Sequence, residues 1–306
     1  MGDPVVVAGG TGAIGRNLVR SLAESGHRVV ILTRGTSREV GGTSVQYRQW
    51  DPYSGKVPID ALDGAYAVVN LAGAQIFAPW KAGYEEEVVR SRVLSTKAIV
   101  DAMKACKDPP DVLVNASASG YYGADGWDDQ PVTEDAPAGS DFWGDLVSRW
   151  EAEAMRAADT GRRVVLLRTC PILMADAGPM AVLLPLFRRG LGGYVRPGNQ
   201  WFPWIHITDE VEAIRFLMER EASKGPYNLS APGIVRFREF TDLLASKLGG
   251  KARIPAPMFI LRRRFGRAAE MLPNGKRVVP KRLNEEGFTF RFPGLSEALD
   301  DILRST

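Results

Sequence analysis

The sequence is poor in cysteine and histidine and has no long uninterrupted apolar run. Its two cysteines, Cys106 and Cys170, are too few for a disulfide framework and favour a cytoplasmic protein with two buried thiols. The most apolar long window, residues 169–187, contains Asp176 and three prolines, so no membrane-spanning helix is expected. The apolar run at residues 5–8 ends at once in glycines, so no signal peptide is predicted. Two histidines and two cysteines far apart indicate no metal site.

Neither sign of charge is in excess overall, because 39 Lys and Arg residues against 36 Asp and Glu residues leave a net charge of +3. This balance favours neither a nucleic-acid partner nor a membrane surface. The charge is nevertheless uneven, since residues 251–291 hold 11 Lys and Arg but only 3 Asp and Glu, a net +8. We interpret this segment either as a solvated basic face or as a docking surface for an acidic protein partner, and not as a nucleic-acid-binding surface.

The 306 residues, 45% of them hydrophobic, suffice for a large core and for two lobes. Short apolar strands alternate with helical patterns in the first half, which predicts parallel strands covered on both faces. The predicted strands are residues 5–8, 28–33, 45–50, 67–71, 111–116 and 163–168, and the predicted helices are residues 14–26, 84–106 and 141–158. The fold class is therefore α/β, with a Rossmann-type doubly wound parallel sheet.

The pattern changes after residue 170, where proline and glycine become frequent. We predict that residues 1–170 form a cofactor-binding Rossmann domain, which residues 204–230 complete. Residues 171–203 and 231–306 then form a smaller mixed C-terminal lobe that contributes to substrate binding. Further helices are predicted at residues 210–221, 238–248 and 295–303, and a further strand at residues 227–230.

Glycines lie between the first predicted strand and the first predicted helix. Gly9, Gly12 and Gly15 fit the pattern G-x-x-G-x-x-G, and Gly10, Gly12 and Gly15 fit G-x-G-x-x-G. Glycines at such a junction permit a tight turn, bring the backbone close to a pyrophosphate and expose the N–H groups of the helix N-terminus. The sequence therefore predicts a dinucleotide-binding loop, composed of Gly9, Gly10, Thr11, Gly12, Ala13, Ile14 and Gly15.

The end of the second predicted strand indicates which dinucleotide binds. An NAD site usually has an acidic residue here, which accepts a hydrogen bond from the ribose 2′-hydroxyl. This strand instead ends in Thr33 and Arg34, followed by Ser37 and Arg38, with no acid before Glu39. Because guanidinium groups bind phosphate by paired hydrogen bonds, the pattern predicts NADP (NADPH) rather than NAD.

Several motifs resemble those of a known family. Gly-Gly-Thr-Gly-Ala-Ile-Gly at 9–15, Asn-Leu-Ala-Gly at 70–73, Ser-Ala-Ser-Gly-Tyr-Tyr-Gly at 117–123 and Trp-Ile-His-Ile-Thr-Asp at 204–209 resemble the extended short-chain dehydrogenase/reductases. Residues 273–299, with Lys-Arg-Val-Val-Pro-Lys-Arg-Leu and Glu-Gly-Phe, are similar to the small C-terminal domain of an atypical branch. Its members are labelled epimerase family proteins, of the SulA-type, NAD-dependent epimerase/dehydratase-like group. The resemblance covers essentially the whole chain.

The resemblance implies further contacts with the cofactor. The backbone after the fourth strand would lie along the adenosine and ribose, and Asp51, after the third strand, would accept from the adenine amino group. As a bare feature, Asp51-Pro52 is also a turn starter. Arg92, on the long helix, could reach the nicotinamide side, or it could be a solvated helix charge. The additional cofactor-binding residues are Asp51, Leu71, Ala72, Gly73, Arg92, Ser117 and Ala118.

One departure from the family bears on catalysis. The usual Tyr-x-x-x-Lys pair, in which Lys lowers the pKa of a proton-donating Tyr, falls on Trp143 and Val147, and neither side chain transfers a proton. The usual carbonyl-polarising serine falls on Ala118, between Ser117 and Ser119. The residues that could donate the proton in place of the missing Tyr are the catalytic candidates, Tyr121, Ser117 and Ser119, together with Tyr122. Both tyrosines could equally be packing residues.

Aromatic residues accumulate where a substrate would bind, which predicts a flat apolar pocket with few polar anchors. Some of these rings are instead expected to be plain core residues. The predicted pocket residues are Phe77, Trp80, Tyr121, Trp143, Trp201 and Trp204. Pro171 takes the place at which related sugar-nucleotide epimerases usually carry a substrate-binding asparagine, which argues against a nucleotide-sugar substrate.

The sequence thus predicts a cytoplasmic NADP(H)-dependent oxidoreductase that reduces a small apolar or aromatic substrate without the usual Tyr-x-x-x-Lys pair. The alternative is a non-catalytic NADPH-binding sensor or regulatory protein. The missing pair favours the alternative, and the aromatic pocket favours the enzyme. A homodimer is compatible with the sequence, which does not determine the oligomeric state.

Overall fold

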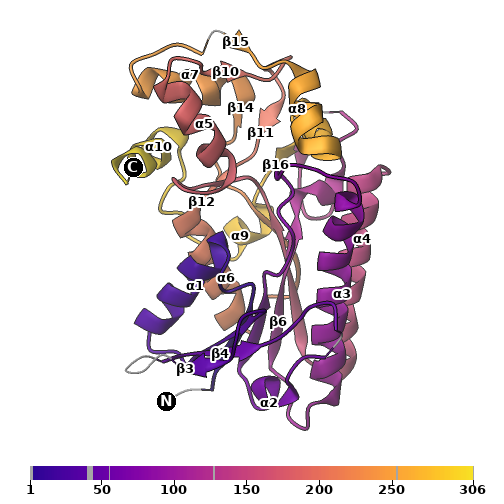
Figure 1. Cartoon of the computed structure of the whole chain (residues 1–306). Coiled ribbons are helices and arrows are strands. Elements are labelled where there is room, and N and C mark those ends of the chain that lie inside the picture. The colour runs from indigo at the N-terminus through magenta and orange to yellow at the C-terminus, as the bar shows by residue number, and fades with distance from the viewer. Residues whose placement is uncertain (1–2, 40–43, 55, 127, 253, 306) are drawn as a thin grey trace.

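The computed structural model describes residues 3–39, 44–54, 56–126, 128–252 and 254–305, which form a large lobe and a small lobe (Figure 1). The large lobe contains an eight-stranded sheet with the order β13-β8-β6-β5-β1-β2-β4-β3. Its parallel strands are β1 (Val5–Ala8), β2 (Val29–Thr33), β4 (Val45–Gln49), β5 (Ala67–Asn70), β6 (Val112–Ala118), β8 (Arg163–Thr169) and β13 (Gly225–Leu229). The edge strand β3 (Arg38–Glu39) runs antiparallel to β4.

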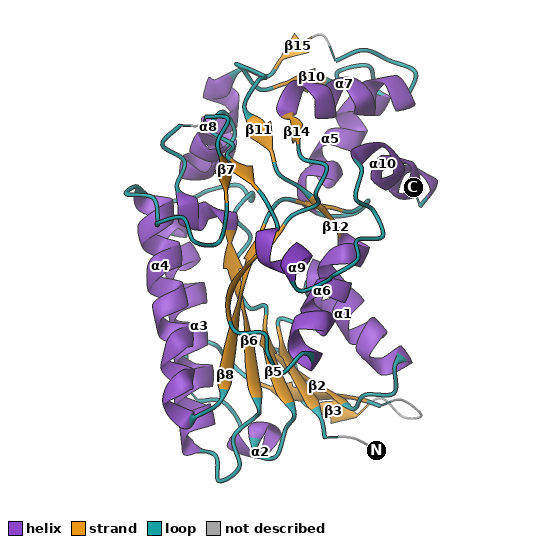
Figure 2. Ribbon diagram, turned by 180° about the vertical axis from the view of Figure 1, so that it is seen from behind, coloured by secondary structure: helices purple, strands orange, loops and turns teal. Residues whose placement is uncertain are grey.

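Helices cover both faces of this sheet (Figure 2). Helices α1 (Ala13–Glu24) and α6 (Ile207–Glu219) pack on one face, whereas α2 (Ile59–Leu62), α3 (Tyr84–Ala105) and α4 (Phe142–Met155) pack on the other. The central strands β1, β2 and β5 are apolar almost throughout because both of their faces are buried. Asp141 ends the loop before α4 by accepting a hydrogen bond from the Gly144 N–H at 2.9 Å. The predicted doubly wound Rossmann-type sheet is confirmed.

The small lobe contains helices α5 (Gly178–Arg188), α7 (Phe237–Lys247), α8 (Met258–Phe265) and α10 (Leu295–Arg304). Two-residue strands connect them: β9 (Ile172–Leu173) pairs with β12 (Ile205–His206), β10 (Gly193–Tyr194) with β15 (Ile254–Pro255), and β11 (Trp201–Phe202) with β14 (Val235–Arg236). Its core is separate from that of the sheet and is centred on Leu173, Trp204 and Phe240, which are fully buried. Short 3₁₀ turns are η1 (Ser119–Tyr122), η2 (Arg156–Thr160) and η3 (Gly266–Met271).

The C-terminal segment is not confined to the small lobe. Strand β16 (Arg277–Val278) pairs with β7 (Pro131–Val132), and α9 (Lys281–Glu285) packs against β13. Leu283 and Phe288 belong to the apolar core of the large lobe. The sequence-based assignment of residues 231–306 to the small lobe is therefore wrong for this segment, because its apolar side chains are needed to cover the sheet beside β13.

None of the helices in the described part of the chain combines the length and the apolar character needed to cross a bilayer. Likewise, the described ranges contain no group of three or more His, Cys, Asp or Glu side chains arranged to hold a metal ion.

Candidate functional site

The glycine loop at the carboxyl end of β1 has a geometry that larger residues would not permit. Gly9 has a φ of +78°, and a Cβ atom there would lie 2.7 Å from the carbonyl carbon of Leu71. A Cβ atom on Gly15 would lie 2.2 Å from the Gly9 carbonyl oxygen. The loop, the first turn of α1 and the end of β5 are therefore packed backbone against backbone.

The N-terminus of α1 is exposed above this loop. Gly12, its N-cap residue, provides no side-chain cap, and the first turn contains no acidic residue. The N–H groups of a first helical turn have no intrahelical partners, and they carry the positive end of the helix dipole. Thr11 and Gly12 are exposed. These residues therefore fit the pyrophosphate of a dinucleotide, because the backbone approaches the site with no side chain in the way.

The end of β2 presents cations and hydroxyl groups to solvent. Arg34 and Arg38 are exposed, and the Arg38 guanidinium lies 4.4 Å from the centre of the Tyr47 ring. Within the described ranges, no carboxylate forms an ion pair with either arginine. The Ser37 hydroxyl accepts from the Gln49 N–H at 2.8 Å, and Thr33 Oγ1 accepts from the Gly35 N–H at 3.2 Å. Within the described ranges neither hydroxyl donates to a protein acceptor, so both protons are available to an anion.

Asp51, at the end of β4, starts a turn. Its Oδ1 accepts from the Tyr53 N–H at 3.0 Å, and its backbone carbonyl accepts from the Ser54 hydroxyl at 2.8 Å. The side chain is exposed. The turn-forming role is thus present, and the contact with adenine stays a prediction.

A buried polar network positions the segment after β5, where Leu71, Ala72 and Gly73 lie. The Asn70 amide donates to Thr96 Oγ1 at 3.0 Å and to Asn115 Oδ1 at 2.7 Å, while its own oxygen accepts from the Ala72 N–H at 3.2 Å. The Leu71 N–H donates to the Ala8 carbonyl at 2.9 Å. Neighbouring strands therefore hold this backbone at the same edge as the glycine loop.

Arg92 reaches this edge from α3 but is buried rather than solvated. It donates to the carbonyls of Val88 at 3.1 Å and Ala74 at 3.0 Å, and a Cβ atom on Gly73 would lie 3.4 Å from its Cζ. Burial lowers its pKa to about 10. No carboxylate in the described ranges pairs with it. A buried cation without a buried anion suits an anionic ligand beside Gly73.

On the α4 side of the sheet, the carboxyl ends of β6 and β8 hold a closed network. Arg168 donates to both oxygens of Glu151, at 2.8 and 2.9 Å, and Ser117 Oγ donates to the same carboxylate at 2.6 Å. Arg168 also donates to the Tyr122 hydroxyl at 3.0 Å, and Tyr122 donates to Asn228 Oδ1 at 2.6 Å. The proton of Ser117, a catalytic candidate, is therefore engaged in a structural ion-pair network.

The other two catalytic candidates lie in η1. The half-buried Tyr121 ring stacks on the Arg168 guanidinium, 3.4 Å from its Cζ, and meets Tyr122 edge-on at 5.4 Å. Ser119 hydrogen-bonds the Cys170 thiol, whose pKa burial raises. Neither placement assigns a chemical role, so both stay predictions.

Two of the predicted pocket residues belong to packed cores. Trp143 is 1% exposed in a cluster with Trp80, and a Cβ atom on Gly120 would lie 3.8 Å from both Trp143 and Val147. Trp204 is fully buried in the small-lobe core and donates from Nε1 to the Gly233 carbonyl at 3.0 Å. Their prediction as residues of an open pocket was wrong, because neighbouring side chains cover both rings.

The remaining predicted pocket aromatics fall into separate places. Phe77 is 43% exposed and meets Phe265 edge-on at 5.8 Å, close to Trp80 in the same cluster. Trp201 instead lies beneath Arg236, with 3.7 Å between the guanidinium carbon and the ring centre, and donates to the Asp128 carbonyl at 3.0 Å. Only Phe77 and Trp80 therefore flank the segment that follows β5.

Two polar residues that sequence reasoning missed face the other side of the sheet. Thr169 Oγ1 donates to Glu210 Oε1 at 2.8 Å, and the Glu210 side chain is fully buried. Burial raises the Glu210 pKa to about 8. Its Oε2 has no hydrogen-bond partner within the described ranges. The sequence signal that could have revealed Glu210 is a glutamate among the buried residues of α6, which include Val211 and Ile214.

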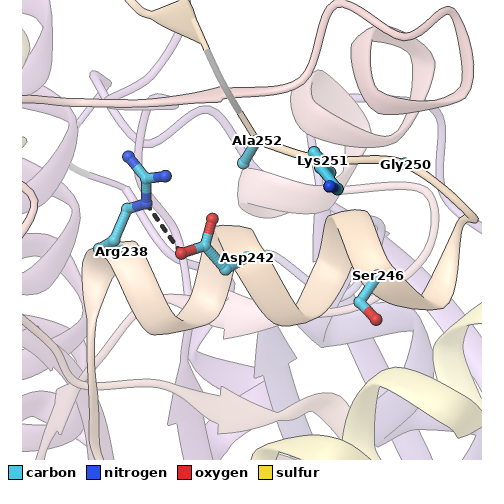
Figure 3. Close-up of a pocket in the computed structure, with 6 residues that line it drawn as sticks. All are labelled: Arg238, Asp242, Ser246, Gly250, Lys251 and Ala252. Atoms are coloured by element: carbon cyan, nitrogen blue, oxygen red, sulfur yellow. Dashed lines mark hydrogen bonds and ion pairs between the residues drawn. The ribbon is translucent and has the colours of Figure 1, made fainter.

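A hollow of about 500 Å³ lies elsewhere, on α7 of the small lobe (Figure 3). Arg238 and Asp242, one turn apart on α7, form an ion pair at 2.8 Å (Figure 3). It is remote from the glycine loop (Figure 1) and is not part of the candidate site. Its lining residues are Arg238, Asp242, Ser246, Gly250, Lys251 and Ala252.

The basic segment 251–291, of which residue 253 lies outside the described residues, includes α8. Arg262, Arg263 and Arg264 are exposed there, and Phe259 and Ile260 are 74% and 50% exposed. A docking role for an acidic protein stays a prediction.

The comparisons with known proteins agree with this geometry. Residues 5–230 match the NAD dependent epimerase/dehydratase family, and residues 256–302 match a domain of unknown function, DUF1731. The human epimerase family protein SDR39U1 is 35% identical over 98% of this chain and 99% of its own length. The Arabidopsis thaliana chloroplastic homologue of SDR39U1 is 33% identical over 98% of this chain and 86% of its own length.

Solved structures give the same result. The crystal structure of human SDR39U1 (isoform 2) with NADPH has a TM-score of 0.87 and 33% identity, covering 99% of this chain and 100% of that chain. The nucleoside-diphosphate sugar epimerase of Corynebacterium glutamicum has a TM-score of 0.81 and 29% identity, covering 99% of this chain and 58% of that chain. The glycine loop, the parallel sheet and these matches together show that the chain belongs to the NAD dependent epimerase/dehydratase family, of the short-chain dehydrogenase/reductase type, with a C-terminal DUF1731 domain.

Proposed function

We propose that this protein is an NADPH-dependent oxidoreductase that reduces a small apolar or aromatic compound. The observation that carries the choice of cofactor is the end of β2, where Arg34 and Arg38 are exposed with the hydroxyls of Thr33 and Ser37. This set suits a 2′-phosphate, for which guanidinium groups and hydroxyls are the usual donors. The human relative, whose structure was determined with NADPH, supports the same choice.

The bound cofactor would supply a hydride. The chain would hold its pyrophosphate at Gly9–Gly15, and the buried Arg92, beside Gly73, would lie on the nicotinamide side. Exposed Phe77 and the neighbouring Trp80 provide an apolar surface beside the segment after β5. Because the usual Tyr and Lys are replaced by buried Trp143 and Val147, activated C=C or C=N bonds fit better than carbonyls, since their reduction demands less of a proton donor.

A second candidate function is a non-catalytic NADPH sensor or regulator. The packing of Trp143 favours it, because this ring occupies the place of the usual proton donor and is 1% exposed. The two functions differ in a direct measurement, which is the oxidation of NADPH in the presence of carbonyl, enone and imine compounds. Turnover that is lost on Tyr121→Phe would support the enzyme with its sequence-predicted donor. Tight NADPH binding without any turnover would support the sensor.

The test of the cofactor site is a comparison of NADPH and NADH affinities. Arg34→Ala should weaken NADPH binding about ten- to a hundredfold, because a charge-assisted hydrogen bond is removed, and should change NADH binding less than twofold. Arg149→Ala, an exposed arginine on α4, is the matched control and should alter neither affinity. Equal weakening of both cofactors by Arg34→Ala would contradict the proposal.

We further propose a cytoplasmic location, which the two free thiols, Cys106 and Cys170, support. We also propose that the basic segment 251–291 docks an acidic protein partner. A homodimer is a further proposal.

A further inference from the structure

A hydroxyl group lies next to Ala118, the residue at which the resemblance places the usual serine. Thr169 and Ala118 are partners in the parallel register of β8 and β6. Side chains alternate between the faces of a strand, and Leu167 and Val114 belong to the core beneath α6, so Thr169 and Ala118 both face that side. Adjacent strands lie about 5 Å apart. The Thr169 hydroxyl is therefore one strand away from the methyl side chain of Ala118.

Glu210 lies behind this hydroxyl, in contact with it at 2.8 Å. The carboxyl group is fully buried, its Oε2 has no partner, and no Lys or Arg within the described ranges forms an ion pair with it. An isolated carboxylate is costly to bury, so such a group is held in its neutral form. A titratable group near Glu210 is the Cys170 thiol, and burial raises the pKa of this thiol as well.

Thr169 Oγ1 donates to Oε1 of Glu210 at 2.8 Å when Glu210 is a carboxylate. When Glu210 is protonated, the carboxyl group donates to Thr169 Oγ1 instead, and this leaves the proton of Thr169 to be donated elsewhere. The other acceptor near Thr169 Oγ1 is the Leu167 carbonyl at 3.4 Å, a long contact. Thr169 is half-buried whereas Glu210 is fully buried, so the pair leads from the interior toward the carboxyl edge of the sheet. The edge is where ligands bind in open α/β sheets.

We propose that Thr169 is the proton donor of the reduction and that Glu210 is the proton store behind it. The inference rests on the proposed reductase function. As hydride adds to one atom of the substrate double bond, the π-electron pair at the other atom takes the proton of Thr169 Oγ1. Glu210 passes its own proton to Thr169 and becomes a carboxylate, which then regains a proton from water. One C–H bond and one X–H bond form, the double bond is reduced, and the cofactor is oxidised.

The first test needs neither cofactor nor substrate. Infrared spectra of the protein at pH 7 should contain a protonated-carboxyl band that Glu210→Gln removes and that Thr169→Val shifts, because the valine no longer hydrogen-bonds the acid. Glu134→Gln is the matched control, since Glu134 is also a buried acid with an unpartnered oxygen. That substitution should leave the Thr169-sensitive band unchanged. Absence of a Glu210 band at pH 7 would overturn the proposal.

The second test uses NADPH and an acceptor that the wild-type protein reduces. Thr169→Val should lower kcat about a hundredfold or more, with KM and NADPH affinity changed less than twofold, whereas Thr169→Ser should retain most of the rate. Glu210→Gln should lower kcat about tenfold and remove the loss of activity expected above pH 8. Thr241→Val, which removes a buried hydroxyl in α7, should have no effect on the rate.

The outcomes separate the two proposals. If no acceptor is reduced by the wild-type protein, the reductase function fails and this inference fails with it. If the wild-type protein turns over but Thr169→Val does so equally well, the inference alone is overturned. A loss of turnover on Tyr121→Phe with Thr169→Val unaffected would overturn it in favour of the tyrosine.

Discussion

Two buried carboxyl groups lie on opposite faces of the main sheet at the same edge, and the protein holds them in opposite ways. Glu151, on α4, accepts from two of the Arg168 nitrogens, Nε and Nη2, and from Ser117. Glu210, on α6, contacts Thr169 with one oxygen, and its other oxygen has no partner within the described ranges. The first group is a satisfied ion pair, and the second is an acid kept neutral by burial.

The two groups differ in how much freedom each has to exchange a proton. A satisfied ion pair has no proton to give and fixes the loop η1 and the strand ends around it. An acid with one carboxyl oxygen unpartnered is costly to bury, and its raised pKa lets it lose a proton near neutral pH. Groups with such shifted pKa values are frequent at functional sites. We therefore expect substitutions on the α4 side to act mainly on folding, and those on the α6 side to act mainly on proton exchange.

The largest expected effect follows from breaking the satisfied pair. Glu151→Ala leaves the Arg168 guanidinium buried without its anion and should lower the free energy of unfolding by about 3 to 5 kcal/mol in denaturant titrations. Glu153→Ala, on the same helix, removes a more exposed ion pair with Arg156 and should cost less than about 1 kcal/mol. Similar losses for the two variants would abolish the contrast between a buried network and a surface pair.

A smaller effect should appear as a pH dependence caused by Glu210. Its folded-state pKa of about 8 lies above the 4.5 of an unperturbed glutamate, so the native state holds a proton that the unfolded state loses. This contribution to stability is complete below pH 4.5 and is lost as pH rises toward 8, by at most about 1.4 kcal/mol per pH unit. Unfolding measured from pH 5 to 9 should show this decline in the wild-type protein.

Glu210→Gln should flatten that pH dependence, because the amide does not titrate. Glu151→Gln, which changes the satisfied carboxylate on the opposite face, should leave the alkaline decline in place. A decline that persists unchanged in Glu210→Gln would show that another group causes it.

The smallest effect should come from Ser117. Ser117→Ala removes one of the three hydrogen bonds described to Glu151, while both bonds from Arg168 remain, so unfolding should become easier by about 1 kcal/mol. On the functional side, turnover of any accepted substrate should change little. A loss of turnover without a loss of stability would return Ser117 to the group of catalytic candidates.

The sequence predicts those features that depend on neighbouring residues. The glycine loop before α1, the strand pattern and the long helix α3 could be recognised because their signals lie within one contiguous stretch. The exposure of Arg34 follows in the same way from its place just after β2.

What the sequence did not predict depends on contacts between distant segments. Thr169 and Glu210 are 41 residues apart, and they meet only because α6 packs across the end of β8. The burial of Trp143 and Trp204 was missed because a pattern of aromatic residues does not distinguish a pocket from a core. Arg92 was open to two readings because a helix position alone does not reveal the carbonyl groups that its guanidinium meets.

The return of the C-terminal segment to the main sheet affects how the molecule is made on the ribosome. Leu283 and Phe288 complete the core beside β13, and Glu286 accepts from the hydroxyl of Tyr227 at 2.6 Å. A nascent chain that ends before residue 281 thus lacks part of the cover of its last parallel strand. We therefore expect the large lobe to be completed only after residues 281–288 have been synthesised, because this part of the region that matches the second family model covers the sheet of the first.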